Sequence, residues 1–298
     1  MRDYHWDADF DSVRRFLGNL FPIQKSYTNW LPTTLENVKF GPGGTEYRDD
    51  EDEYLKIWEE ADQIVAFSVT KPSGSCHLSI HPDFIDRAGE IIIWMQDRIH
   101  NLKQHDTVKM SLVVDDNDSE LISILSELGF EKDEIEGDNQ IRPSDATIPD
   151  YTLPEGYSVR NVVMYDEYEK YRVVQKSVFP HIKSMSDKIL DIFTTASFYH
   201  SELDIVAVAP NGEFAAFCTA RLDPISGITE LEPVGTHPEH RKLGLGKAVI
   251  LESLKRLQKF KPSVVAILGA APTEGARKLY KSVGFDNKGP AHYWVKNI

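Results

Sequence analysis

The residues best suited to chemistry lie between Val234 and Ala248, which read VGTHPEHRKLGLGKA. A strand pattern ends here and a helical pattern follows, so the segment predicts a strand, a turn and a helix over Arg241–Phe260. The first turn of a helix carries unpaired N–H groups and a partial positive charge, which favour an anion. Gly244 and Gly246 lack a Cβ atom, so a ligand can approach the main chain closely. The segment therefore predicts a site for a diphosphate.

Basic residues in the same segment support an anionic ligand. Arg241, Lys242 and Lys247 fall in the first two turns of the predicted helix, where positive charge opposes the helix dipole. An anion would remove that conflict. Other glycine loops fit poorly, because a Rossmann fingerprint needs a small residue where Val249 stands and a P-loop needs a hydroxyl where Ala248 stands.

Two carboxylates precede this loop on the predicted strand Ile228–Thr236. Glu230 and Glu232 are two residues apart, so we expect them to project to one face and to be candidate general bases, with Glu232 ranked first. An ordinary surface role is the alternative for both. Pro233 cannot donate to a sheet ladder, so we expect this strand to part from the apolar strand Pro262–Ala270.

A second helical segment, Thr273–Val283, ends at Gly284 in the position typical of a helix C-terminus. Ala276 and Tyr280 lie at i and i+4 on one face of this helix. A buried core tyrosine is the default interpretation of Tyr280.

Together these segments resemble the GNAT N-acetyltransferase superfamily. Its signature Gln/Arg-x-x-Gly-x-Gly/Ala is met by Arg241, Gly244 and Gly246. The downstream motif Asn-x-x-Ala-x-x-Leu-Tyr-x-x-x-Gly-Phe is met from Ala276 to Phe285, with Thr273 replacing the Asn. The resemblance covers Tyr157–Ile298.

The resemblance implies acetyl-CoA as co-substrate, no metal, and transfer of its acetyl group to a primary amine by direct attack on the thioester. It implies that Tyr280 protonates the departing thiolate, and that the N–H of Val234 meets the developing oxyanion. The implied acetyl-CoA-binding residues are Val234, Gly235, Thr236, Arg241, Lys242, Leu243, Gly244, Leu245, Gly246, Lys247 and Thr273. A non-catalytic acyl-CoA-binding or sensor protein, and an acyltransferase using another acyl-CoA, remain alternatives.

The first half shows the same order of elements without the binding motif. His81–Glu90 reads HPDFIDRAGE and lacks Arg-x-x-Gly-x-Gly, whereas Leu128-Gly129-Phe130 matches Val283-Gly284-Phe285 in kind. We infer an internal duplication with a degenerate first copy, as in tandem GNAT proteins of the mycothiol-synthase type. The expected fold is α/β (α+β), with two GNAT-like domains, each a mixed, mostly antiparallel sheet flanked by helices. The expected limits are 1–140 and 157–298, joined by a proline-containing linker at 141–156.

The amino-acid composition limits the kinds of partner that the protein is expected to bind. The chain has 298 residues and a net charge of −14, of which residues 1–150, with 31 acidic and 14 basic side chains, carry −17. Such an acidic half disfavours nucleic acid and favours a cationic small amine as acceptor; a polyamine, amino sugar, amino-thiol conjugate and peptide N-terminus all stay open. Two cysteines, Cys76 and Cys218, exclude a disulfide framework and a multi-cysteine metal site. Without an apolar run long enough to cross a bilayer, we expect a cytoplasmic monomer or homodimer that binds no membrane.

Overall fold

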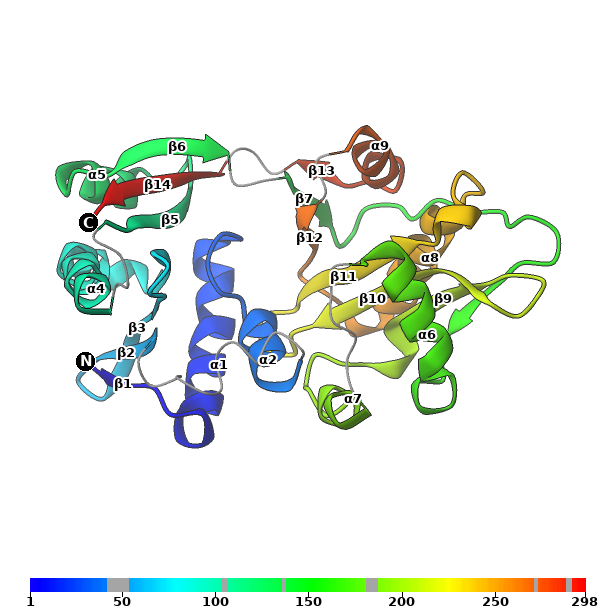
Figure 1. The fold of residues 1–298 in the computed structure, drawn as a ribbon, viewed down its shortest axis with the longest axis horizontal. Helices are drawn as coiled ribbons and strands as arrows, with labels where there is room; N and C mark the ends of the chain where they lie inside the picture. The colour runs from blue at the N-terminus through cyan, green and yellow to red at the C-terminus, as the bar shows by residue number, and fades with distance from the viewer. Residues whose placement is uncertain (42–53, 103–106, 136–137, 181–186, 271–272, 288–290) are drawn as a thin grey trace. The chain divides into compact units, whose positions relative to one another are not determined.

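The chain divides into two compact units in the computed structural model, which describes residues 1–41, 54–102, 107–135, 138–180, 187–270, 273–287 and 291–298. Unit 1 comprises residues 1–35, 45–137 and 289–298, and unit 2 comprises residues 36–44 and 138–288. Each unit contains a seven-stranded sheet and its own buried core (Figure 1). The predicted α/β fold with two mixed, mostly antiparallel sheets is confirmed.

Unit 1 has the strand order β1-β2-β3-β4-β5-β14-β6. Its strands are β1 (Arg2–Asp3), β2 (Leu55–Glu60), β3 (Gln63–Thr70), β4 (Ser75–Ile80), β5 (Lys109–Asp115), β6 (Glu131–Ile135) and β14 (Ala291–Asn297), and its helices are α1 (Trp6–Gln24), α4 (Ala88–Leu102) and α5 (Ser119–Glu127). Ile91, Met95 and Ile99 recur every fourth residue of α4 and are buried in the core against the sheet. Among the strand pairs formed by the described residues of this unit, only β4 and β5 run parallel.

Unit 2 has the strand order β13-β7-β12-β11-β10-β9-β8. Its strands are β7 (Asp138–Pro143), β8 (Ser158–Asn161), β9 (Asp204–Val208), β10 (Phe214–Leu222), β11 (Ile228–Thr236), β12 (Val264–Ala270) and β13 (Asp286–Asn287), and its helices are α6 (Met164–Val178), α7 (Asp187–Phe193), α8 (Leu245–Leu257) and α9 (Glu274–Ser282). The second half of α2 (Pro32–Phe40) also belongs to this unit. Again one neighbouring pair, β11 with β12, runs parallel.

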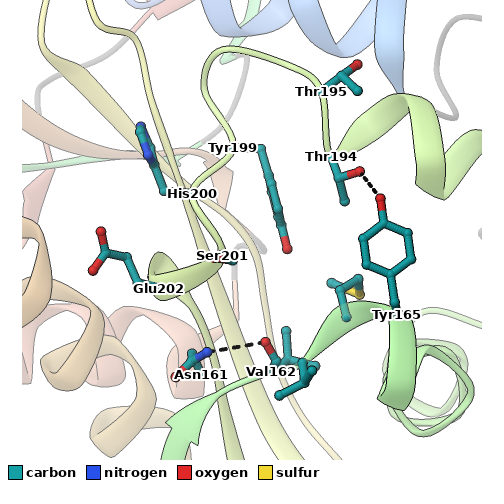
Figure 2. Close-up of a pocket in the computed structure, with 11 residues that line it drawn as sticks. Asn161, Val162, Tyr165, Thr194, Thr195, Tyr199, His200, Ser201 and Glu202 are labelled. Carbon is teal, nitrogen blue, oxygen red and sulfur yellow. Dashed lines mark hydrogen bonds between the residues drawn. The ribbon is translucent and has the colours of Figure 1, made fainter.

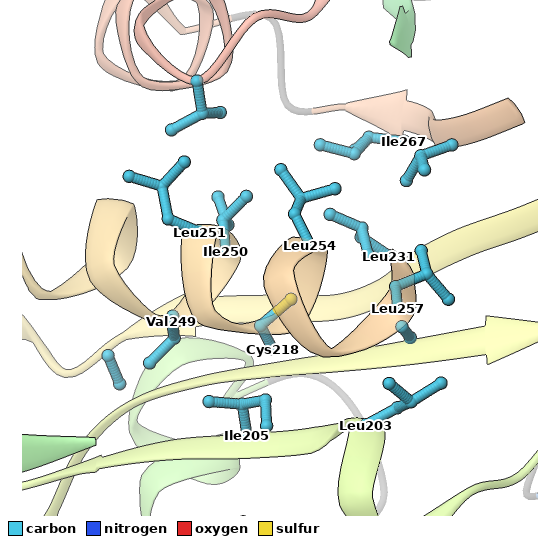
Figure 3. Close-up of a cluster of buried hydrophobic side chains, with 14 of the residues drawn as sticks. Leu203, Ile205, Cys218, Leu231, Val249, Ile250, Leu251, Leu254, Leu257 and Ile267 are labelled. Atoms are coloured by element: carbon cyan, nitrogen blue, oxygen red, sulfur yellow. The ribbon is translucent and has the colours of Figure 1, made fainter. Parts of the chain in front are cut away.

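Helices cover both faces of the unit 2 sheet. Cys218 on β10 packs in the same cluster as Leu251 and Leu254 of α8 (Figure 3). Its neighbour Phe217 belongs to a different cluster, with Tyr171 of α6. Successive strand residues point to opposite faces, so α8 lies on one face and α6 on the other.

The two units have exchanged a strand. Along the chain β6 is followed by β7, yet β6 pairs with β14 in unit 1 and β7 pairs with β12 and β13 in unit 2. The sequence placed residues 141–156 in a linker and did not predict β7, whose Asn-Gln-Ile-Arg pattern is too polar to indicate a buried strand. Arg142 on β7 is nevertheless 1% exposed, because its guanidinium donates to the carbonyls of Pro143, Ala146, Thr147 and Val283.

Local motifs recur in both units. His81 and His237 each begin a 3-10 turn and each accept, on Nδ1, the N–H of the second residue after them at 3.3 Å. Gly129 and Gly284 follow α5 and α9 with φ of +80° and +88°. The same elements in the same order, with the same turn chemistry, support the inferred duplication.

Candidate functional site

Strands β11 and β12 are paired at one end and separate at the other. Their described register joins residues 228–230 to residues 264–266 and goes no further. A bulge between Leu231 and Val234 also shifts β11 against β10. The separation predicted from Pro233 is confirmed, and the main chain from Val234 to Thr236 has no strand partner on the β12 side within the described residues.

The segment after β11 is a loop before it becomes a helix. The expectation of a helix over Arg241–Phe260 was wrong at its start, because α8 begins at Leu245. Lys242 and Gly244 have φ of 65° and 78°, in the left-handed region that a right-handed helix excludes. Residues 241–244 therefore precede α8, and of the three basic residues only Lys247 lies in its first turn.

The N-terminus of α8 has no side chain that caps it. Gly244 occupies the N-cap position, and the first turn contains no acidic residue. The N–H of Ala248 donates to the Gly244 carbonyl at 3.0 Å, so the N–H groups of residues 245–247 lie outside the helical ladder. A Cβ added at Gly244 would meet no atom within 4 Å, which leaves the main chain open to a ligand. This arrangement fits an anion such as a diphosphate.

Gly246 has a different role from Gly244. It is buried, and an added Cβ would lie 2.9 Å from Thr236 Oγ1 and 3.5 Å from Leu279 Cδ2. Gly246 therefore allows α8 to pack closely against the end of β11 and against α9. The sequence interpretation assigned both glycines to ligand approach, and the geometry supports it for Gly244 and assigns Gly246 to packing.

Exposed basic side chains accompany the open helix terminus. Arg241 and Lys242 are exposed, and Arg241 Nε donates to the carbonyl of Thr236 at 3.3 Å. Neither Lys242 nor Lys247 forms an ion pair with any described residue. Their charges are therefore available to an anionic ligand, and the exposed Leu243 lies between Lys242 and Gly244.

Helix α9 presents Tyr280 close to this opening. Burial raises the pKa of Tyr280 to about 12, with smaller contributions from the charges of Cys218 and Glu232. The phenol therefore keeps its proton at neutral pH. Thr273 is the N-cap of α9, where its Oγ1 accepts the Ala276 N–H at 3.2 Å. Its hydroxyl proton is still able to meet a ligand.

The two candidate bases differ in their surroundings. Glu230 is 9% exposed and lies where β11 still pairs with β12. Glu232 is exposed, lies in the bulge, and has a charge that acts on Tyr280. The alternation on which their shared face was predicted is interrupted directly after Glu232 by the bulge.

The equivalent segment of unit 1 is built differently. The 3-10 turn from Pro82 to Arg87 leads directly into α4, and the Ala88 N–H donates to the Ile85 carbonyl. Glu90 lies in the first turn of α4, where its carboxylate pairs with Arg87. Gly89 in this first turn has Ile124 Cγ2 at 3.7 Å from an added Cβ, so it is less open than Gly244, and Glu90 already supplies an anion, which agrees with the predicted degenerate copy.

Unit 2 also contains a pocket of about 670 Å³ at the other end of its sheet. Figure 2 shows it between the start of α6 and the segment that joins α7 to β9, with the Tyr165 hydroxyl bonded to Thr194. Tyr199, which lines the pocket, donates to Asp204 Oδ2 at 3.4 Å. Asp204 is fully buried, and burial raises its pKa to about 6. Sequence reasoning missed Asp204, because a single carboxylate at the start of a strand belongs to no motif.

The described residues contain no helix that is both long and apolar enough to cross a bilayer. Nor do they contain a group of three or more His, Cys, Asp or Glu placed to hold a metal ion.

Comparisons with known proteins agree with this geometry. Residues 164–285 match the acetyltransferase (GNAT) family model. A stretch of 153 residues is 29% identical to mycothiol acetyltransferase of Paenarthrobacter aurescens, over 49% of this chain and 47% of that protein. The mycothiol acetyltransferase of Arthrobacter sp. (strain FB24) is 28% identical with the same coverage. The chain spans about half the length of the curated relatives it matches.

Solved structures share the fold of both units. A GCN5-related N-acetyltransferase from Sphaerobacter thermophilus aligns with a TM-score of 0.64 and 17% identity, over 99% of this chain and 94% of that chain. A tandem GNAT protein from the clavulanic acid biosynthesis pathway aligns with a TM-score of 0.61 and 14% identity, over 99% and 97%. These likenesses concern the fold alone, and they extend over both units.

Proposed function

We propose that the protein transfers an acetyl group from acetyl-CoA to a primary amine, because residues 164–285 match the GNAT acetyltransferase family model and the whole chain is similar in fold to a tandem GNAT protein. The observation that carries this proposal is the uncapped terminus of α8 beside the separated strands β11 and β12. The acceptor is a small molecule, and the acidic first half favours a cationic one.

We propose that unit 2 holds acetyl-CoA with main-chain and basic groups. The diphosphate meets the N–H groups of Leu243, Gly244, Leu245, Gly246 and Lys247, with Arg241, Lys242 and Lys247 supplying charge. The pantetheine arm lies along the side of Val234, Gly235 and Thr236 that faces away from β10 and that β12 leaves free, as an added strand would. Thr273 donates its hydroxyl proton to the same ligand. Gly235 also serves packing, because a Cβ there would lie 2.5 Å from the Phe217 ring.

When bound, acetyl-CoA supplies an activated carbonyl carbon and a thiolate leaving group. We propose that the N–H of Val234 donates a hydrogen bond where negative charge develops on the carbonyl oxygen. The Tyr280 hydroxyl donates its proton to the departing sulfur. At neutral pH the phenol holds this proton, because burial keeps its pKa high, at about 12.

The acceptor amine must lose a proton before it attacks, since an ordinary ammonium has a pKa of about 10.4. We propose Glu232 as the first candidate for the base, acting through water, because it is exposed and its charge reaches Tyr280. Glu230 is the second candidate, because it is only 9% exposed and therefore less accessible to solvent water than Glu232.

One experiment separates a catalyst from an acyl-CoA-binding sensor. Acetyl-CoA is supplied with a panel of amines to the full chain, and release of free thiol is measured for wild type, Tyr280→Phe and Glu232→Gln. We expect turnover with at least one amine, and a loss of about 10²–10⁴ in kcat for Tyr280→Phe with unchanged coenzyme A affinity. Tight coenzyme A binding without turnover on any amine would favour the sensor. Competition among acyl-CoAs tests the alternative of another acyl donor.

A further inference from the structure

Arg221 on β10 carries a positive charge that the protein leaves without a hydrogen-bond partner. Its Nε is buried and unpaired, and no nitrogen of this guanidinium forms a hydrogen bond or ion pair with any described residue. The side chain is half-buried and only Nε is fully shielded, so its two terminal nitrogens reach the surface. Buried donors without acceptors are costly, which indicates that another group completes this site.

The surroundings hold the guanidinium in place without using its donors. Its Cζ lies 5.7 Å from the ring centre of Phe193 and 5.4 Å from that of Phe198. Asp204 is close enough for the two charges to interact, but its oxygens accept the hydroxyls of Thr219 at 2.7 Å and Tyr199 at 3.4 Å. The negative charge of Asp204 therefore offsets the positive charge of Arg221, but Asp204 accepts no hydrogen bond from the Arg221 guanidinium.

The strand register relates Arg221 to the opening between β11 and β12. Arg221 and Glu230 are register partners on β10 and β11, so their side chains share a sheet face. Glu230 is the last residue of β11 paired with β12, so Arg221 lies at the narrow end of the opening. The diphosphate-binding loop begins after Thr236, six residues and roughly 20 Å further along the strand. Arg221 is therefore too far away to bind the diphosphate.

We propose that Arg221 binds a carboxylate on the acceptor, so that the substrate is an amine that also carries an acid group. A planar guanidinium matches a carboxylate with two parallel hydrogen bonds. Val234, where the thioester carbonyl is proposed to lie, is four residues beyond the partner of Arg221. Four strand residues span roughly 13 Å, and the residue absorbed by the bulge reduces the separation of the amine and the carboxylate to roughly 10 Å. This inference rests on the proposed function.

The test uses conjugates in which the sulfur of coenzyme A is joined through an acetyl group to an amine. The amine carries a chain of two to eight atoms that ends in a carboxylate or in the neutral carboxamide. Affinities are measured by calorimetry on the full chain for wild type, Arg221→Gln and Arg221→Lys, with the exposed Arg172→Gln of α6 as a matched control. The affinity of every variant for unmodified coenzyme A is also measured, to show that the diphosphate-binding loop is intact.

We expect wild type to bind the carboxylate conjugate about tenfold or more tightly than the carboxamide for at least one chain length. Arg221→Gln should bring this ratio close to one, Arg221→Lys should retain part of it, and Arg172→Gln should leave it unchanged. Normal coenzyme A binding without discrimination at any length in wild type would overturn the role of Arg221 alone. Absence of coenzyme A binding would instead contradict the proposed function and, with it, this inference.

Discussion

Alanine at Gly244 and alanine at Gly246 should harm the protein in different ways, although both glycines belong to one motif. Gly244 has a φ of 78° with open space around it, so the cost of alanine there is backbone strain of about 1 kcal/mol. At Gly246 the new Cβ would stand 2.9 Å from Thr236 Oγ1, and overpacking costs about 2 kcal/mol. Alanine recovers about 1 kcal/mol of helix propensity there, which leaves a net loss of about 1 kcal/mol.

A second substitution distinguishes the two causes. Thr236→Ala removes the oxygen that crowds position 246, so it should rescue the stability of Gly246→Ala and leave that of Gly244→Ala unchanged. The assay is urea unfolding of the full chain, following the transition that coenzyme A shifts upward, because a ligand stabilises the unit that binds it. A neutral Gly246→Ala, or equal rescue of both alanine variants by Thr236→Ala, would refute this assignment of roles.

Ligand binding should also distinguish the two glycines. The methyl group of Gly244→Ala stands in the open space where the diphosphate is proposed to lie, whereas that of Gly246→Ala points at Thr236. We expect coenzyme A affinity, measured by calorimetry, to fall more for Gly244→Ala than for Gly246→Ala. The reverse order would contradict the placement of the diphosphate at Gly244.

Two further predictions concern buried polar residues of unit 2. Asp204 ionises near 3.8 when unfolded and near 6 when folded, so its contribution to stability falls as the pH rises through that window. Asp204→Asn should lack this fall, so its free energy of unfolding should gain about 3 kcal/mol relative to that of wild type between pH 4 and pH 7. Urea unfolding at several pH values measures this difference. A difference that stays constant with pH would contradict the burial of a charge at Asp204. Arg142→Met leaves four backbone carbonyls without their donor and should lower the free energy of unfolding by about 3 kcal/mol, whereas an unchanged unfolding midpoint would show that these bonds contribute little.

The sequence predicted the parts of the site that depend on local chemistry. Pro233 indicated where β11 leaves β12, and Gly284 indicated the end of α9, because each acts through its own backbone. The predicted start of α8 was wrong because Lys242 has a left-handed backbone conformation. Lysine rarely adopts this conformation, so the sequence did not predict it there.

Features that depend on distant partners were not predictable. The apolar pattern of a strand does not say which of two similar sheets it joins, so the exchange of β7 and β14 left no local signal. From the sequence, Arg142 is expected to lie at the surface. The carbonyls that accept hydrogen bonds from its guanidinium become its neighbours only in the folded chain. The unpaired state of Arg221 is likewise visible only once β10 and its surroundings are assembled.

The central claim is that the main-chain amides at the start of α8 hold the diphosphate of coenzyme A. Calorimetry of the full chain with coenzyme A and with pantetheine, which lacks the diphosphate, tests it most directly. We predict that coenzyme A binds about a hundredfold or more tightly than pantetheine, and that Lys247→Gln weakens only coenzyme A. Equal affinities for the two ligands, or no heat with coenzyme A, would contradict the account.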